Sequence, residues 1–187
     1  SPKVTTETTS PSLITWSLDM DAHEISMKFD ENIDASTLSP AALTLQDSAV
    51  GGSSRALSGG IVSSSDGSIM VVSMLAADIK AVEESVSIAK SLSSTYLSFS
   101  SSLASDMAGN SVNAVPAGAA VKAQALTPDS TPPGNALSAS AVPGDAAASV
   151  AWKNPPDVDF CGVLVLRSEA APSAAAPADG SSYSAEI

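Results

Sequence analysis

The chain has 187 residues, enough for one large domain or two small ones. Its 20 acidic and 8 basic residues give a net charge of −12, which argues against binding to nucleic acid or to anionic membranes. Leu, Ile, Val and Phe together number 40, near the lower limit for folded chains, but only 15% of residues are charged, so we expect a folded protein with a small core.

Two copies of one linker-like phrase divide the chain. TTETTSP occupies residues 5–11, and an edited version, TPDSTPP, follows 122 residues later at residues 127–133. Proline and small hydroxylated residues favour extended, semi-rigid spacers. The predicted organisation is an N-terminal linker at 1–11, a first domain at 12–126, a Pro-rich linker at 127–133 and a partial second domain at 134–187.

Between the linkers the hydrophobic pattern is that of β-strands. In residues 23–29, HEISMKF, the residues Ile25, Met27 and Phe29 alternate with polar ones, as in a strand with one buried face. Residues 69–74, IMVVSM, are apolar on both faces and predict a central strand. Further strands are predicted at 13–16, 43–45, 96–99 and 112–125, the last interrupted by Pro116, with loops at 51–54 and 59–60.

One segment has a helical pattern. Leu75, Ile79, Val82 and Val86 are spaced by four, three and four residues, with charged residues between them. This spacing places them on one face of a short helix. We expect the helix to cross over between two sheets.

The second domain is predicted to begin with strands at 136–142 and 147–152, which flank a turn. Residues 154–157 form another turn, the apolar run FCGVLVLR at 160–167 a third strand, and Tyr183 lies near a possible fourth. A β-sandwich needs about 100 residues, whereas 54 follow Pro133. We therefore expect that a longer polypeptide or another chain completes this sheet.

Three runs in the first domain resemble bacterial-type Ig-like repeats of S-layer and other surface proteins: LDMDAHEISMKFDENIDASTL, GGIVSSSDGSIMVVSM and TYLSFSSSLASDMAGNSV. The later run AVPGDAAASVAWKNPPDVDFCGVLVLR is similar to the opening of a fibronectin type III-like domain. The resemblance implies an all-β fold of tandem Ig-like β-sandwich domains, with one short crossover helix in the first. It also implies a large extracellular surface or filament protein, such as the mastigoneme glycoproteins of microalgae.

Clustered carboxylates in turns are the candidate ligands for a metal ion. Asp106 and Asn110 frame the sequence DMAGN, and Asp129 in the linker could join them at a domain junction. Oxygen ligands of this kind suit calcium, which takes six to eight. The alternative is that Asp106 and Asn110 only stabilise a tight turn. Other turn carboxylates are Asp19, Asp21, Asp30, Glu31 and Asp34.

Little in the sequence predicts catalysis, so we expect no enzyme and no cofactor other than calcium. The chain has one histidine, His23, and one cysteine, Cys161, too few for a zinc site or an internal disulfide. Thr127, Ser130 and Thr131, beside prolines, are candidate O-glycosylation sites, and no N-glycosylation sequon occurs.

The leading hypothesis is a structural segment of an extracellular modular array at the cell surface, whose partners are other protein chains or further domains. No membrane-spanning segment is predicted within it. One alternative is an adhesin-type binding module, although few aromatic residues are available for a ligand patch. Another is an accessory domain of a secreted enzyme.

Overall fold

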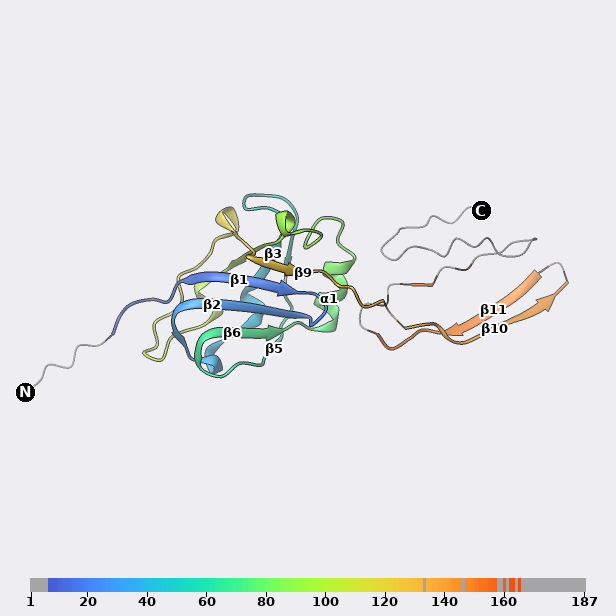
Figure 1. The fold of residues 1–187 in the computed structure, drawn as a ribbon, viewed down its shortest axis with the longest axis horizontal. Coiled ribbons are helices and arrows are strands. Elements are labelled where there is room, and N and C mark those ends of the chain that lie inside the picture. The colour runs from blue at the N-terminus through green and yellow to red at the C-terminus, as the bar shows by residue number, and fades with distance from the viewer. Residues whose placement is uncertain are drawn as a thin grey trace, which may run out of the picture. The chain divides into compact units, whose positions relative to one another are not determined.

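The computed structural model describes residues 7–132, 134–145, 147–157, 160, 162–163 and 165. Its contacts divide the chain into two compact units, Ser1–Ser130 (unit 1) and Thr131–Ile187 (unit 2). The described residues form an all-β fold with one short α-helix, as the sequence predicts (Figure 1).

Eleven strands and the helix account for the regular structure of the described residues. The strands are β1 (Leu13–Asp19), β2 (Glu24–Ile33), β3 (Leu43–Gln46), β4 (Ser54–Ala56), β5 (Ile61–Val62), β6 (Gly67–Ser73), β7 (Tyr96–Phe99), β8 (Val121–Lys122), β9 (Ala125–Thr127), β10 (Leu137–Gly144) and β11 (Ala147–Lys153). The helix is α1 (Ala76–Glu83), and short 3-10 turns occur at Ala35–Thr37, Pro40–Ala42, Leu92–Ser94, Ser101–Leu103 and Ala117–Ala119.

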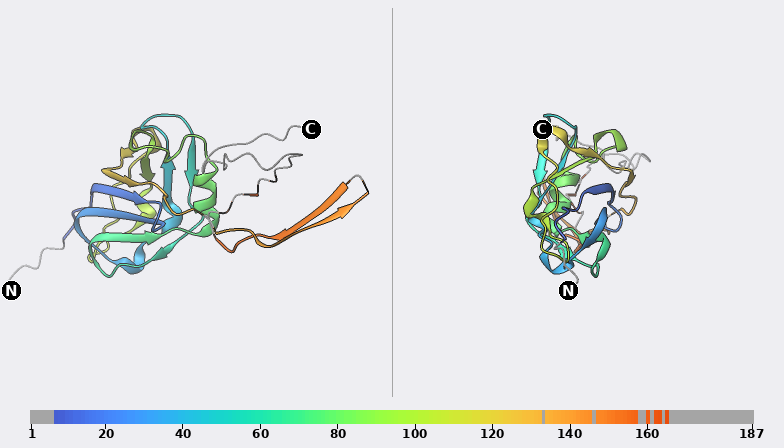
Figure 2. Two further views of the ribbon diagram at one scale, coloured as in Figure 1. Left: turned by 45° about the vertical axis from the view of Figure 1, so that its right-hand side comes forward. Right: turned by 90° about the vertical axis from the view of Figure 1, so that its left-hand side faces the viewer.

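Unit 1 consists of two sheets with the core between them. The five-stranded sheet has the order β5-β6-β2-β1-β9, and the four-stranded sheet has the order β4-β3-β7-β8 (Figure 2). Neighbouring strands are antiparallel except β9, which runs parallel to β1. Because β8 and β9 follow each other in the chain, the last part of unit 1 passes from one sheet to the other.

The core follows from the alternation along the strands. Trp16 and Leu18 of β1 pair with Met27 and Ile25 of β2, so all four side chains point to one face and are buried. The four-stranded sheet contributes a second buried row, formed by Leu43, Leu45, Leu97 and Phe99. Burial of these two rows against each other holds the sheets together.

Helix α1 connects β6 of one sheet to β7 of the other, which confirms the predicted crossover. Ile79 and Val82 are buried, but Leu75 is the residue that precedes the helix, and Val86 lies beyond its end with 95% of its surface exposed. The helix therefore ends before the fourth residue of the predicted apolar face.

The predicted central strand at residues 69–74 is confirmed as part of β6, which pairs with β5 on one side and β2 on the other. Met70 and Val72 are buried, whereas Ile69 is 55% exposed on the outer face of the sheet. One prediction about strands is wrong. Residues 112–125 do not form one strand, because the chain turns through 3-10 geometry after Pro116 and then contributes β8 and β9 to different sheets.

The two linker phrases are partly integrated into unit 1. Pro11 is buried, and its carbonyl oxygen accepts a 2.8 Å hydrogen bond from the backbone N–H of Asn113. Thr127 belongs to β9, and its carbonyl oxygen accepts from the N–H of Met20 at 2.9 Å. Both linker phrases thus make backbone hydrogen bonds with residues 12–126.

In unit 2 the predicted hairpin is present as β10 and β11, which are exposed on both faces. Of the predicted strand 160–167, the described residues Phe160, Gly162, Val163 and Val165 are not in a strand. Cys161, the remainder of that segment, and residues 166–187, which include Tyr183, lie outside the described residues.

Candidate cation site at the Asp106 turn

The sequence DMAGN forms a tight turn that is organised by Asp106. Its Oδ1 accepts hydrogen bonds from the N–H groups of Ala108 (2.8 Å) and Asn110 (2.7 Å), and its Oδ2 accepts from the Asn110 side-chain amide at 2.8 Å. Gly109 has φ +90°, a conformation that favours glycine. The backbone of Asp106 also bridges to Ile33 at the end of β2, so the turn is fixed to the five-stranded sheet.

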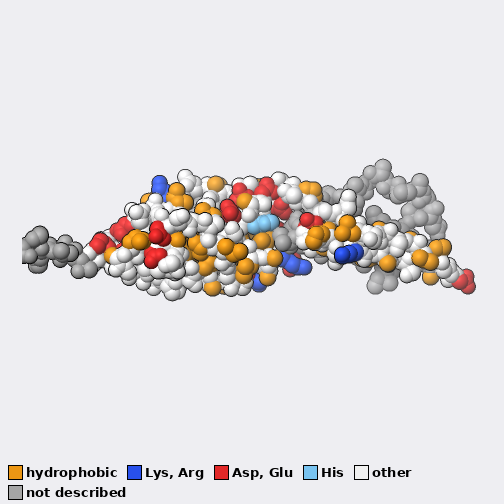
Figure 3. Space-filling model, turned by 90° about the horizontal axis from the view of Figure 1, so that it is seen from below, with side chains coloured by type: hydrophobic (Ala, Val, Ile, Leu, Met, Phe, Trp, Pro, Cys, Tyr) orange, Lys and Arg blue, Asp and Glu red, His pale blue; other side chains and the backbone are white. Residues whose placement is uncertain are grey.

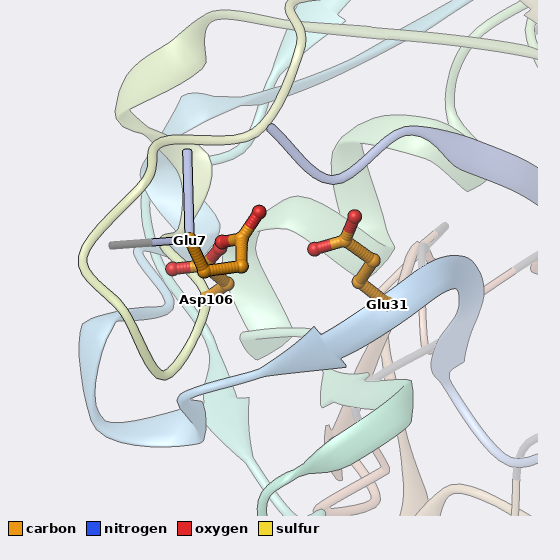
Figure 4. A group of neighbouring side chains, drawn as sticks. All are labelled: Glu7, Glu31 and Asp106. Carbon is orange, nitrogen blue, oxygen red and sulfur yellow. The ribbon is translucent and has the colours of Figure 1, made fainter. Parts of the chain in front are cut away.

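Two glutamates from other parts of the chain meet this turn. The Oε2 of Glu7 accepts a hydrogen bond from the Asn110 side-chain amide at 2.5 Å. Glu31 extends from β2 toward Glu7 and Asp106 (Figure 4), and one carboxylate oxygen of each of the three residues lies within 4.8 Å of those of the others. We call Glu7, Glu31 and Asp106 the carboxylate trio.

The environment shifts the pKa values of two members in opposite directions. The pKa of Glu31 is raised, first by burial and then by repulsion from the negative charges of Glu7, Asp30 and Asp106. For Asp106 burial also acts to raise the pKa, but the hydrogen bonds from Asn110 and Ala108 outweigh it, and the pKa lies below its ordinary value. Asp106 is therefore held as an anion, while ionisation of Glu31 is disfavoured.

The chemistry of the trio suits a hard divalent cation. Three carboxylates supply up to six oxygen atoms, and calcium takes six to eight oxygen ligands at 2.3–2.6 Å. A cation would also remove the repulsion that raises the pKa of Glu31. The hydrogen bonds of Asp106, however, can hold the turn in this geometry without any ion. This is what the alternative interpretation of DMAGN, a tight turn only, expects.

The structure brings together Asp106 and Asn110 but places Asp129 elsewhere. Asp106 pairs with Ile33 at the end of β2, whereas Ser130, next to Asp129, is bonded to Asp21 in the turn that precedes β2. The ten residues of β2 separate these two ends by about 30 Å. Figure 3 shows acidic side chains toward both ends of unit 1, with hydrophobic side chains between them.

Glu7, rather than Asp129, is the linker carboxylate that lies beside Asp106 and Asn110. It stands 122 residues before Asp129, at the matching position of the first linker phrase, and is therefore its counterpart. The repetition of the linker phrase is the feature of the sequence that could have identified Glu7 as a candidate. The other turn carboxylates cap backbone groups: Asp19 accepts from Ala22, Asp30 from Ser12 and Asp34 from Ser36.

The other candidate residues are the histidine and the three candidate O-glycosylation sites. His23 lies in the turn between β1 and β2 with φ 58°, and its carbonyl oxygen accepts a hydrogen bond from Met74. Thr127 and Thr131 are exposed, whereas the hydroxyl of Ser130 donates to Asp21. Within the described ranges, no helix has the length and apolar character needed to cross a membrane.

Comparisons with known proteins return two solved structures. No family model matches the chain, and no curated protein matches it either. The N-terminal part of the bacterial S-layer protein SbsC aligns with 76% of this chain at 14% identity and a TM-score of 0.37. Domains 1–6 of SbsC align with 78% of this chain at 16% identity and a TM-score of 0.38. The chain spans 31% and 19% of those two structures.

Proposed function

We propose that the chain is a structural, non-catalytic segment of a modular extracellular protein that forms a surface coat or filament. The observation that carries the proposal is the hairpin of unit 2, which presents an apolar face without a covering layer among the described residues. In the proposed assembly, a neighbouring module would cover this face.

The register of the hairpin defines that face. Ala141 pairs with Val150 and Pro143 with Ala148, so these four side chains and Trp152 lie on the same side. Val150 is 45% exposed and Trp152 is 39% exposed. A two-stranded hairpin is marginally stable alone, and three or more strands or a second layer are needed. The proposed partner of this face is a further domain of the same polypeptide or another chain.

The composition of unit 1 agrees with a structural role. Its surface is rich in serine, threonine and acidic residues, and the chain offers one histidine for acid–base chemistry. His23 lies in a tight turn, as described above. The narrower identities, a mastigoneme-like filament or a surface-coat array, rest on the family resemblance of the sequence and are part of this proposal. An adhesin-type module or an accessory domain of a secreted enzyme is the alternative.

Two chemical features are proposed with it. Calcium is proposed as a ligand of the turn that contains Asp106 and Asn110, supported by the carboxylate trio. O-glycosylation is proposed at Thr127, Ser130 and Thr131. A glycan on Ser130 would replace the proton that its hydroxyl donates to Asp21, so Ser130 would be modified only at the cost of that bond.

Labelling of intact cells with a membrane-impermeant, amine-reactive reagent tests the extracellular location. Lys28, Lys80, Lys122 and Lys153 are exposed and would react. We expect peptides that contain these lysines to carry the label before lysis, in the fraction that is released with the surface layer. Labelling that occurs only after lysis would contradict the proposal.

A further inference from the structure

The outer face of the five-stranded sheet carries opposite charges on its central strand. β2 occupies the middle of the order β5-β6-β2-β1-β9, and its residues Glu24, Ser26 and Lys28 alternate with the buried residues Ile25 and Met27. In Figure 1 this sheet lies toward the viewer. Lys28 is exposed, and Glu24 and Ser26 are half-buried. Within unit 1 this face is therefore open to solvent.

The strand register extends the pattern of β2 across its neighbours. Side chains that pair between β6, β2 and β1 lie in rows on the same face. The three rows, in the order β6, β2, β1, are Ser73, Glu24 and Asp19; then Val71, Ser26 and Ser17; then Ile69, Lys28 and Thr15. The face is accordingly acidic toward one end of β2 and basic toward the other, with uncharged side chains in the row between them.

Neither of these two charges on β2 is neutralised by a salt bridge within the described ranges. The one salt bridge in that part of the chain joins Lys80 to Glu84. Lys28 lines a shallow hollow of about 180 Å³ together with Ile69 and Thr15. The ammonium group of Lys28 therefore has open space beside it, which a carboxylate from another molecule can enter.

We infer that this face binds the same face of a second copy of the chain, with the two β2 strands antiparallel. In a two-fold interface both copies use the same patch. An axis that lies in the interface, perpendicular to β2 at Ser26, places Glu24 of each copy opposite Lys28 of the other. Both charges stand about 7 Å from Ser26, on either side of it, so the two ion pairs form together.

The charge pattern also selects this arrangement over its alternative. A two-fold axis along β2 would place Glu24 opposite Glu24 and Lys28 opposite Lys28, and like charges across an interface oppose association. In the antiparallel arrangement the middle rows meet, so Val71 of one copy contacts Val71 of the other. Ser26 and Ser17 in the same row are short, which lets the two sheets approach each other closely.

Sedimentation equilibrium of the full chain tests this contact, in a reducing buffer that excludes a disulfide through Cys161. Each chain carries a net charge of −12, so the measurement is made at about 0.15 M salt, where repulsion beyond about 8 Å is screened. We expect a reversible dimer at chain concentrations up to about 1 mM. Glu24→Lys and Lys28→Glu each place like charges opposite each other at two points. Each is expected to raise the dissociation constant about 10-fold or more.

The direction of the Glu24→Lys effect separates this contact from general repulsion. That variant reduces the net charge from −12 to −10, so a general charge effect would strengthen association, whereas the proposed pairing predicts that association weakens. The matched controls are Glu84→Lys and Lys122→Glu, which make the same charge changes on α1 and β8, outside this face. We expect both controls to dimerise like the parent.

Rescue of association gives the most specific result. In an equimolar mixture, the Glu24→Lys copy presents two positive charges to the two negative charges of the Lys28→Glu copy. We therefore expect a mixed dimer although each variant alone is monomeric at the same concentration. The combined variant Glu24→Lys/Lys28→Glu exchanges the two charges within one chain and is expected to regain the parent dissociation constant to within about three-fold.

A monomeric parent would overturn the inference, and so would a dimer that neither single variant weakens, since it would form through another surface. The inference goes beyond the proposed function, because it concerns contact between copies and not location. The labelling of intact cells reads the location separately. Because the contact is reversible, Lys28 remains accessible to that reagent part of the time, and it reacts more slowly than Lys122.

Discussion

The indole Nε1 of Trp16 donates a 2.8 Å hydrogen bond to the carbonyl oxygen of Val121, 105 residues later. Trp16 belongs to the five-stranded sheet and Val121 to the four-stranded sheet, so this bond joins the two layers of unit 1. Trp16 is also among the largest fully buried side chains. One residue thus supplies apolar volume to the core and a polar link across it.

Trp16→Phe is expected to destabilise unit 1 by about 1–3 kcal/mol, because the part-buried Val121 carbonyl oxygen loses this hydrogen-bond partner. Trp16→Ala is expected to cost about 3–5 kcal/mol, since a cavity is added. Urea unfolding followed by circular dichroism measures both. The matched control is Trp152→Phe, a partly exposed tryptophan in unit 2, which leaves the transition of unit 1 in place. An unchanged midpoint for Trp16→Phe would contradict the role of the bond.

Asp106→Asn is expected to lower the melting temperature at neutral pH, because it replaces an ionised acceptor in the DMAGN turn. The pKa of Asp106 is lowered in the fold, so its contribution to stability is present above the ordinary value of 3.8 and is lost as the pH falls through the native pKa. Parent and variant should therefore converge in acid. Melting curves between pH 2 and pH 7 test this, with Asp145→Asn as the control. A difference that persists in strong acid would contradict it.

Glu31→Gln is expected to raise the melting temperature at neutral pH in the absence of divalent cations. The pKa of Glu31 is raised in the fold, so ionisation destabilises unit 1 as the pH rises through that pKa, and the amide cannot ionise. Below the ordinary value of 4.5 the two proteins should melt together. Glu84→Gln, which alters an exposed partner of Lys80, is the matched control. A variant less stable than the parent would contradict the proposed cost of ionising Glu31.

Calcium is expected to raise the melting temperature of the parent and to have little effect on Glu31→Gln, because a ligand stabilises the state that binds it. Titration calorimetry with calcium chloride provides the direct measurement. If calcium produces neither a heat of binding nor a change of melting temperature in the parent, the calcium proposal is ruled out. The trio would then be only part of a hydrogen-bonded turn.

Asp78→Ala is expected to destabilise unit 1 by about 1–3 kcal/mol. Asp78 is fully buried in α1, and its Oδ2 accepts from both the N–H and the hydroxyl of Ser58 at 2.8 Å. Removal of the carboxylate leaves the Ser58 N–H without that acceptor. Asp78→Asn retains one side-chain oxygen and should lose less stability than Asp78→Ala. Urea unfolding measures both variants. Equal stability of Asp78→Ala and the parent would contradict this account.

The parts of the fold that the sequence predicts are those with a local pattern. Alternation of Ile25, Met27 and Phe29 predicts β2 because side chains on a strand repeat every two residues. The spacing of Ile79 and Val82 likewise predicts α1. In contrast, β9 has three residues and pairs in parallel with β1, so no local period marks it.

The candidate site could be predicted only in part for a related reason. DMAGN contains a complete turn signature, and Asp106 and Asn110 therefore stand out in the sequence. Glu7 and Asp106 are 99 positions apart, and their proximity depends on how the N-terminal segment packs beside the turn. The linker phrases show the same limit, because their composition predicts a spacer but not the contacts of Ser130 with Asp21.

Immunogold electron microscopy of intact cells, with an antibody raised against unit 1, tests the central claim most directly. The account predicts gold particles outside the cell, at regular intervals along a filament or across a surface coat. Particles confined to the cell interior, or an epitope found only in soluble secreted material, would contradict it.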